Sequence, residues 1–163
     1  MNVQPEFRFM VDHMLIKLGK YLRILGYDAE WDTYLRTHEL ILVANSENRV
    51  FLTRNTKLGD QYPFVRKVLV ISSTDPQQQL KQVILQTGIN PQCHLFSRCV
   101  RCNVVLYNVL DKKEIEGCVH PHVYLRHEHF FKCPLCDTIF WRGSHVVNTC
   151  TKLGLKMPGS ASM

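Results

Sequence analysis

The sequence predicts an α/β fold in two parts: a parallel β-sheet flanked by helices, then a smaller β-rich part that carries most of the cysteines. Strand-like and helix-like segments alternate up to about residue 90, and this order is typical of a parallel sheet with helices on its faces. Beyond Gly88–Pro91 the alternation stops, and Cys, His and short β-prone runs become frequent. We therefore expect an α/β domain over residues 1–92, a second part over 93–150 and a flexible tail over 151–163.

Four strands are expected in the first part, each a short run rich in β-branched, aromatic or aliphatic residues. They are Phe7–Val11, Tyr27–Trp31, Val50–Thr53 and Lys67–Ile71. In the second part, β-prone runs follow the cysteines at Val104–Tyr107, His129–Lys132 and Thr138–Trp141.

Three helices are expected between the strands. The first covers residues 14–25, where leucines at spacings of three and four form one apolar face, and Gly26 is placed to end it. Thr37 is expected to N-cap the second helix, which runs through Ala44. Thr74 or Asp75 caps the third, residues 76–87, which has proline in its first turn.

The cysteine spacing carries the strongest chemical signal. Four of the seven cysteines form two C-x-x-C pairs, Cys99 with Cys102 and Cys133 with Cys136, and 30 residues between the pairs leave room for a long hairpin. Four thiolates make a closed tetrahedral set, which predicts one structural Zn²⁺ per chain in a zinc ribbon. Ordinary thiols or disulfides are the alternative, although an odd cysteine count fits poorly with a fully disulfide-bonded scaffold.

The remaining cysteines and the histidines have no diagnostic spacing. Cys93, Cys118 and Cys150 are expected to be buried as small apolar residues. Five histidines of the second part form either a second metal site or solvated and core side chains: His120, His122, His127, His129 and His145.

Acidic and amide side chains follow the predicted strands. Asp12 and Asp32 come after the first two strands, Glu39 lies in the first turn of the second helix, and Asn55 follows the third strand. Strand ends converge in a parallel sheet, so these residues predict either a Mg²⁺ or Mn²⁺ site of a nuclease or ordinary helix-capping carboxylates. Asn55 offers an oxygen but lacks the charge that a hard cation prefers.

A basic stripe on the first predicted helix suggests contact with phosphates. Lys17, Lys20 and Arg23 recur every third residue, and His13, Arg54 and Lys57 extend this face around the strand ends. A groove that follows a nucleic-acid backbone has this pattern, and so does a solvated helix face. The formal charge of +6 is compatible with a phosphate-bearing partner.

Three segments of the sequence resemble the Mut-seven C-terminal RNase domain. They are Phe9–Leu15, Gly19–Asp28 and Arg49–Asn55, and the resemblance continues through Ser97–Asn103, Cys133–Cys136 and Phe140–His145 to cover residues 7 to 150. It implies a PIN-like nuclease domain fused to a zinc ribbon. In animals, a domain of this family forms the C-terminal region of certain 3′–5′ exonucleases. The resemblance therefore also implies that the DEDD exonuclease domain of those proteins is absent from this sequence.

The resemblance also implies site residues. Asp12 matches the aspartate of the family's first strand, and Glu39 falls where PIN domains carry a second acidic residue. The family's Thr-Arg-Asp appears here as Thr53-Arg54-Asn55, which removes one carboxylate from the expected catalytic set. The resemblance leaves the basic face unchanged, and the charge pattern of that face predicts RNA contacts at Lys17, Lys20, Arg23, Arg54 and Lys57.

Three functions follow as hypotheses. The first is a non-catalytic or weakly active accessory domain that binds RNA, a protein cofactor of RNA silencing, or both. The second is an active metal-dependent ribonuclease, and the third is a purely structural interaction module. No apolar stretch approaches the roughly 20 residues of a membrane span, and no secretory signal is evident, so a cytoplasmic location is expected, with RNA granules or the nucleus as alternatives.

Overall fold

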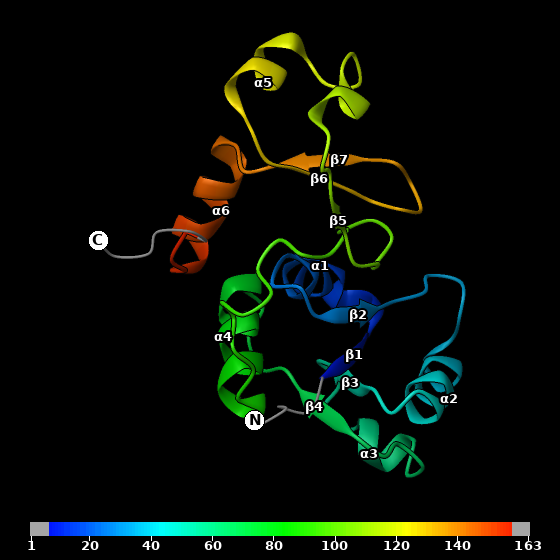
Figure 1. Cartoon of the computed structure of the whole chain (residues 1–163). Helices are drawn as coiled ribbons and strands as arrows, with labels where there is room; N and C mark the ends of the chain where they lie inside the picture. The colour runs from blue at the N-terminus through cyan, green and yellow to red at the C-terminus, as the bar shows by residue number, and fades with distance from the viewer. Residues whose placement is uncertain (1–6, 158–163) are drawn as a thin grey trace, which may run out of the picture.

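The computed structural model describes residues 7–157 and contains both predicted parts (Figure 1). The first part holds a parallel sheet of order β2-β1-β3-β4, and the second a three-stranded antiparallel sheet of order β5-β6-β7. The strands of the parallel sheet are β1 (Arg8–Val11), β2 (Asp28–Glu30), β3 (Val50–Thr53) and β4 (Val68–Val70). Those of the smaller sheet are β5 (Tyr107–Asn108), β6 (Phe130–Lys132) and β7 (Ile139–Trp141). The predicted fold class is confirmed.

The helices of the first part lie close to their predicted positions. They are α1 (Ile16–Ile24), α2 (Thr37–Ser46), the short α3 (Leu58–Gln61) and α4 (Pro76–Thr87). A 3₁₀ turn, η1 (His13–Leu15), precedes α1, because the Asp12 carboxylate accepts a hydrogen bond from the His13 amide at 2.8 Å. Asp75 is confirmed as the cap of α4, since it accepts from the Gln78 amide.

The predicted cap of α2 is wrong by one residue. Thr37 is the first helical residue, and Arg36 occupies the N-cap position. The reason is Glu39, whose carboxylate accepts a hydrogen bond from the Arg36 amide at 2.7 Å and so fixes the first turn one residue earlier.

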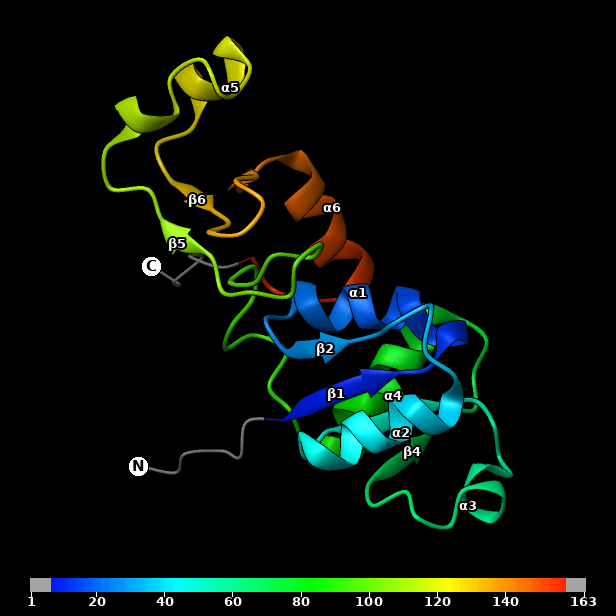
Figure 2. The same ribbon diagram turned by 90° about the vertical axis from the view of Figure 1, so that its right-hand side faces the viewer.

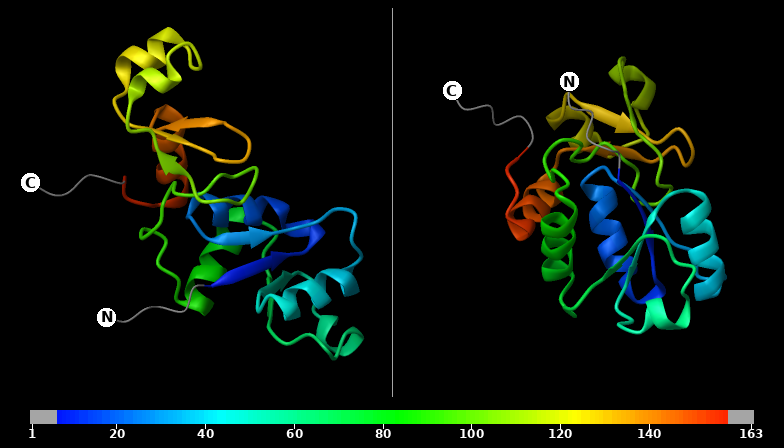
Figure 3. Two further views of the ribbon diagram at one scale, coloured as in Figure 1. Left: turned by 45° about the vertical axis from the view of Figure 1, so that its right-hand side comes forward. Right: turned by 90° about the horizontal axis from the view of Figure 1, so that it is seen from below.

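The two faces of the parallel sheet bury different helices, because side chains alternate along each strand. Phe9, Val11 and Leu52 pack with the leucines of α1 and with α4. Met10 and Phe51 face the opposite side and pack against α2. Figure 3 shows this layering from below, with α1 and α4 on one side of the sheet and α2 on the other. All four leucines of the predicted apolar face, Leu15, Leu18, Leu22 and Leu25, are fully buried.

A helix at the end of the second part completes this core. In α6 (Ser144–Leu153), Val146 and Cys150 are buried in the same hydrophobic cluster as α1 and α4. Figure 2 shows α6 extending from the smaller sheet toward α1. Leu155 and Met157 also pack on this cluster. The predicted flexible tail is therefore wrong over residues 151–157, and residues 158–163 lie outside the described residues.

The segment between the two cysteine pairs differs from a simple hairpin. It pairs β5 with β6, but it also contains the 3₁₀ helix η2 (Lys112–Ile115) and α5 (Pro121–Arg126), which project away from the parallel sheet (Figure 1). The predicted strand Val104–Tyr107 is reduced to β5 and an isolated bridge between Arg98 and Val105. No helix between residues 7 and 157 is both long and apolar enough to cross a membrane.

Side chains occupy both outer edges of the parallel sheet. At β4, the Gln82 amide donates to the Val70 carbonyl at 2.9 Å and accepts from the Ser72 amide at 3.0 Å. At β2, both backbone groups of Ala29 are bonded: its N–H donates to Asn103 Oδ1 at 3.2 Å, and its carbonyl accepts from Arg23 Nε at 2.7 Å. These contacts satisfy groups that another chain could otherwise pair with.

Gly19 makes room for Trp31 against α1. A Cβ atom at position 19 would lie 2.8 Å from two carbon atoms of the Trp31 ring, whereas a Cβ at Gly59 would meet nothing within 4 Å. Gly19→Ala should lower the free energy of unfolding by roughly 1–2 kcal/mol, because overpacking outweighs the gain in helix propensity. Gly59→Ala is the matched control and should be neutral or stabilising. Chemical denaturation measures both, and equal stability of the two variants would contradict the role of Gly19.

Candidate metal centre and strand-end site

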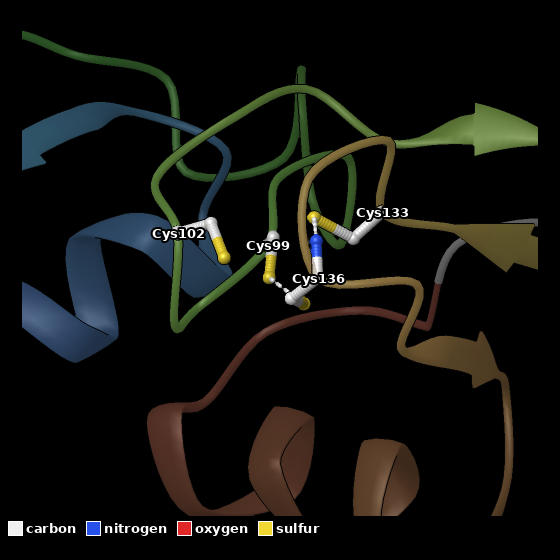
Figure 4. Close-up of side chains that lie close together, drawn as sticks. All are labelled: Cys99, Cys102, Cys133 and Cys136. Atoms are coloured by element: carbon white, nitrogen blue, oxygen red, sulfur yellow. Dashed lines mark hydrogen bonds between the residues drawn. The ribbon is translucent and has the colours of Figure 1, made fainter.

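The two cysteine pairs meet in one cluster. The sulfur atoms of Cys99, Cys102, Cys133 and Cys136 all lie within 4.8 Å of one another, and they come from two loops that face each other (Figure 4). A tetrahedral ion with Zn–S bonds of about 2.3 Å separates its sulfurs by roughly 3.8 Å. The Sγ atoms of Cys99 and Cys136 are 3.9 Å apart. Both the donor set and the spacing fit zinc.

The two loops have the same backbone pattern and form matching knuckles, Cys99–Val104 and Cys133–Thr138. In each, the first cysteine's carbonyl accepts from the amide four residues on, at 2.9 Å from Asn103 and 3.1 Å from Asp137. Asn103 and Asp137 have positive φ angles of 60° and 58°. Asn and Asp tolerate this left-handed conformation, so an Asn or Asp directly after each C-x-x-C is a further sequence signal of a knuckle, beyond the cysteine spacing itself.

Neighbouring groups shift the pKa values of the clustered thiols. Hydrogen bonds with the Thr138 hydroxyl and backbone amide lower the pKa of Cys136 to about 6. The hydrogen bond with Cys136 raises the pKa of Cys102 to about 12. Four sulfurs this close cannot all carry negative charge by themselves, which is why a cation is needed to hold them as thiolates.

The first knuckle is bonded to the parallel sheet by buried polar side chains. Asn103 Nδ2 donates to Asp28 Oδ1 and to Glu30 Oε1, both at 2.7 Å. From the other side, Arg23 donates to the carbonyls of Val100 at 2.8 Å and Arg101 at 3.1 Å. Asn103 and Arg23 are only 6% and 3% exposed. The knuckle therefore covers the outer edge of β2.

Asp28 is the main negative charge under this contact. It accepts hydrogen bonds from Arg49 at 2.6 Å, Arg8 at 3.0 Å and Asn103. Burial raises its pKa, but the hydrogen bonds from Arg49, Asn103 and Arg8 outweigh burial and lower the pKa to about 2. Asp28 thus stays ionised and holds the arginines and the knuckle in place.

At the carboxyl ends of the strands, Asp12 and Asn55 are engaged in local contacts. Asp12 accepts from the Thr53 hydroxyl at 2.7 Å and from the His13 amide. Asn55 accepts from the Lys57 amide at 3.0 Å and donates to Gln61 Oε1 at 2.8 Å. Thr53 and Gln61 were not predicted as site residues. The hydroxyl of Thr53, directly before Arg54-Asn55, was the available signal.

The other acidic residues do not join Asp12 in a cluster. The Glu39 carboxylate accepts a hydrogen bond from the Arg36 backbone amide. Asp32 Oδ1 accepts hydrogen bonds from the backbone amides of Tyr34 and Leu35. Within residues 7–157, the four cysteines are the only group of three or more potential metal-ligating Cys, His, Asp or Glu side chains. The expected gathering of carboxylates at the strand ends is therefore not formed.

The predicted basic face is only partly exposed. Lys17, Lys20 and Lys57 are exposed, and so is His13, whose Nε2 lies 2.8 Å from the Asp32 carbonyl. Arg23 is buried, so its expected place on this face is wrong. Each step of three residues turns a helix by about 300°, which puts Arg23 roughly 120° around α1 from Lys17, where Trp31 covers it. Its guanidinium carbon lies 3.6 Å from the centre of the Trp31 ring.

Arg54 is half-buried, and its Nε atom is buried without a hydrogen-bond partner among the described residues.

The other cysteines and the histidines lie outside the metal cluster. Cys150 is buried in the core as predicted, but Cys93 and Cys118 are exposed, so their predicted burial is wrong. Within the described part of the chain, no second group with histidines has metal-ligating geometry. The aromatic residues of β6 and β7 are buried or half-buried: Phe130, Phe131, Phe140 and Trp141. Phe130 is fully buried, while Phe131, Phe140 and Trp141 line a pocket together with Ile24 and Val146.

Comparison with known proteins gives a consistent result. The family model described as the Mut7-C RNAse domain matches residues 7–153. The human protein named exonuclease mut-7 homolog is 35% identical over 109 residues, which is 62% of this chain and 12% of that protein. The chain thus spans about an eighth of the length of this relative.

We expect one tightly bound Zn²⁺ per chain, held by the four clustered cysteines. Cys133→Ser should lose the metal and unfold the knuckles, because metal binding supplies folding free energy in such modules. Cys118→Ser is the matched control, since this exposed cysteine lies outside the cluster. Elemental analysis and circular dichroism measure both. A Cys133→Ser protein that stays fully folded without metal would refute the assignment.

Proposed function

The chain belongs to the Mut7-C RNase domain family, and from that premise we propose that it is an RNA-binding accessory domain of a 3′–5′ exonuclease. In this proposal, the strand-end site no longer cleaves RNA. Catalysis would be carried out by a separate exonuclease domain, and this domain would hold the substrate. The name of the human relative, an exonuclease, supports this setting.

The proposal rests on the hydrogen bonds that the Asn55 side chain already makes. Both polar atoms of its side chain are occupied, one by the Lys57 amide and the other by Gln61. The Asp12 carboxylate is likewise shared between the Thr53 hydroxyl and the His13 amide. Mg²⁺ and Mn²⁺ sites that act on phosphates require several carboxylate oxygens in one place. A single carboxylate with an engaged amide is a poor site for such a cation.

RNA binding is proposed on the exposed basic residues beside this site. Lys17 and Lys20 project from α1, while Lys57 lies at the start of α3, next to Asn55. These side chains are free to contact phosphates, which give sequence-independent and salt-dependent affinity. The overall charge of +6 favours the same partner.

An active metal-dependent ribonuclease is the second candidate. It is favoured by Asp12, which remains at the end of the central strand β1 beside the Thr53 hydroxyl. The protein cofactor of RNA silencing remains a prediction from the family resemblance. The cytoplasmic location remains a prediction from the sequence, and a purely structural module remains the third hypothesis.

Charge reversal on α1 tests RNA binding. Lys17→Glu with Lys20→Glu should weaken binding of a single-stranded RNA at least tenfold and reduce the slope of log K against log salt by about 1.4, because two phosphate contacts are lost. The matched control reverses two exposed lysines elsewhere, Lys81→Glu with Lys113→Glu, and should change both quantities much less. Fluorescence anisotropy across a salt series measures them. An equal loss in the two double variants would show that only net charge matters.

The cleavage assay tests the loss of catalysis. The wild-type chain should leave RNA intact with either Mg²⁺ or Mn²⁺. Asn55→Asp restores a carboxylate and is the variant most able to gain activity, while Asp12→Asn provides the inactive control. Gel analysis of labelled RNA gives the result. Robust wild-type cleavage that disappears in Asp12→Asn would promote the ribonuclease candidate in place of our proposal.

A further inference from the structure

The first knuckle takes the place of a neighbouring strand at the edge of the parallel sheet. On the outer edge of β2, the Ala29 amide donates to Asn103 Oδ1, and the Ala29 carbonyl accepts from Arg23. The Asn103 side chain also donates to Asp28 and Glu30, the residues on either side of Ala29. One side chain thus bonds all three residues of β2.

Asn103 is placed there by the metal site. It directly follows Cys102, and its amide donates to the carbonyl of Cys99, so its backbone belongs to the turn that presents two of the four sulfurs. Its backbone has a φ of 60°, and its side chain is hydrogen-bonded to β2. The equivalent residue of the second knuckle, Asp137, has the same backbone conformation, but its carboxylate forms an exposed ion pair with Lys132. Only the first knuckle is therefore tied to the parallel sheet in this way.

We infer that Asn103 is a positioning residue that couples metal occupancy of the knuckles to the strand-end surface of the parallel sheet. When the four cysteines hold their ion, the turn at Asn103 is rigid and β2 is closed. When the ion is lost, the turn loosens and β2 loses its outer hydrogen bonds.

The coupling continues from β2 to the strand ends through adjacent contacts. Trp31 follows β2 directly and stacks on Arg23, whose guanidinium also reaches the knuckle carbonyls of Val100 and Arg101. The next residue, Asp32, contacts the exposed His13 ring through its carbonyl. His13 in turn adjoins Asp12. A change at Asn103 therefore reaches the region of the proposed RNA-binding face, although the coupling itself does not depend on RNA binding.

Asn103→Gly separates this role from metal binding. Glycine keeps the left-handed backbone that the turn needs, so the variant should retain one zinc per chain while losing the three hydrogen bonds to β2. Asn103→Asp is a second variant. It keeps the side-chain size and the preference for a left-handed backbone, but it replaces the NH₂ group that donates to Asp28 and Glu30 with a carboxylate oxygen. Asp137→Gly is the matched control, because it makes the same change in the second knuckle.

The readouts are zinc content, NMR hydrogen exchange at the Ala29 amide and the indole N–H resonance of Trp31, all on the full zinc-loaded chain. Both Asn103 variants should keep zinc and shift the Trp31 resonance. In Asn103→Gly, which loses the acceptor of the Ala29 amide, that amide should exchange at least tenfold faster than in wild type. Asp137→Gly should match wild type in all three. Chelation of wild-type zinc should change Ala29 and Trp31 in the same direction as the Asn103 variants.

Three results would overturn the inference. The first is unchanged exchange of the Ala29 amide in Asn103→Gly. The second is an unchanged Trp31 resonance, which would show that the effect stops at β2. The third is loss of zinc from both variants, which would mean that Asn103 serves the knuckle and not the strand.

Discussion

The closure of the β2 edge by Asn103 and Arg23 is the contact on which the rest of the structure depends. It joins a three-residue strand to a metal knuckle more than 70 residues further along the chain. Hydrogen bonds to charged groups contribute about 1.5–3 kcal/mol each, and these partners would be left buried and unpaired if the knuckle moved away. Asp28, with its pKa lowered to about 2, stays charged and anchors the same contact from inside the sheet. The metal site therefore acts on the parallel sheet as well as on its own loops.

A second, apolar contact supports the first. Val146 and Cys150 of α6 belong to the same hydrophobic cluster as α1 and α4. The C-terminal helix of the second part therefore packs into the core of the first part. The polar contact at β2 fixes the position of the first knuckle on the sheet, and the apolar contact of α6 adds buried hydrophobic surface. Between them lies α1, which carries the exposed Lys17 and Lys20 and the buried Arg23. This arrangement gives the proposed RNA-binding helix a rigid support, while the strand-end site beside it has an amide where a catalytic metal needs a further carboxylate.

Local patterns in the sequence were sufficient to predict the fold class, but they were not sufficient to predict the tertiary contacts. The leucine spacing of α1, the strand Val50–Thr53 and the two C-x-x-C pairs were each predicted correctly, because periodicity and ligand spacing are local properties. Arg23 was assigned to the surface because its partners, Trp31 and the Val100 carbonyl, are brought to it only by the tertiary fold. Helix α6 was missed because its β-branched residues resemble the β-prone runs before it, and its helical form depends on burial against α1 and α4. The spacing of Asp12, Asp32 and Glu39 could not show that they form no metal-ligating group, because the carboxylate of each accepts a hydrogen bond from a nearby backbone amide.

The central claim is that the knuckles and the parallel sheet form one cooperative unit. Differential scanning calorimetry of the zinc-loaded chain tests it most directly. We expect a single transition in which the calorimetric and van't Hoff enthalpies agree, because β2, α1 and α6 cannot unfold without disturbing both parts. Two separable transitions, with the ribbon unfolding at one temperature and the parallel sheet at another, would contradict the account.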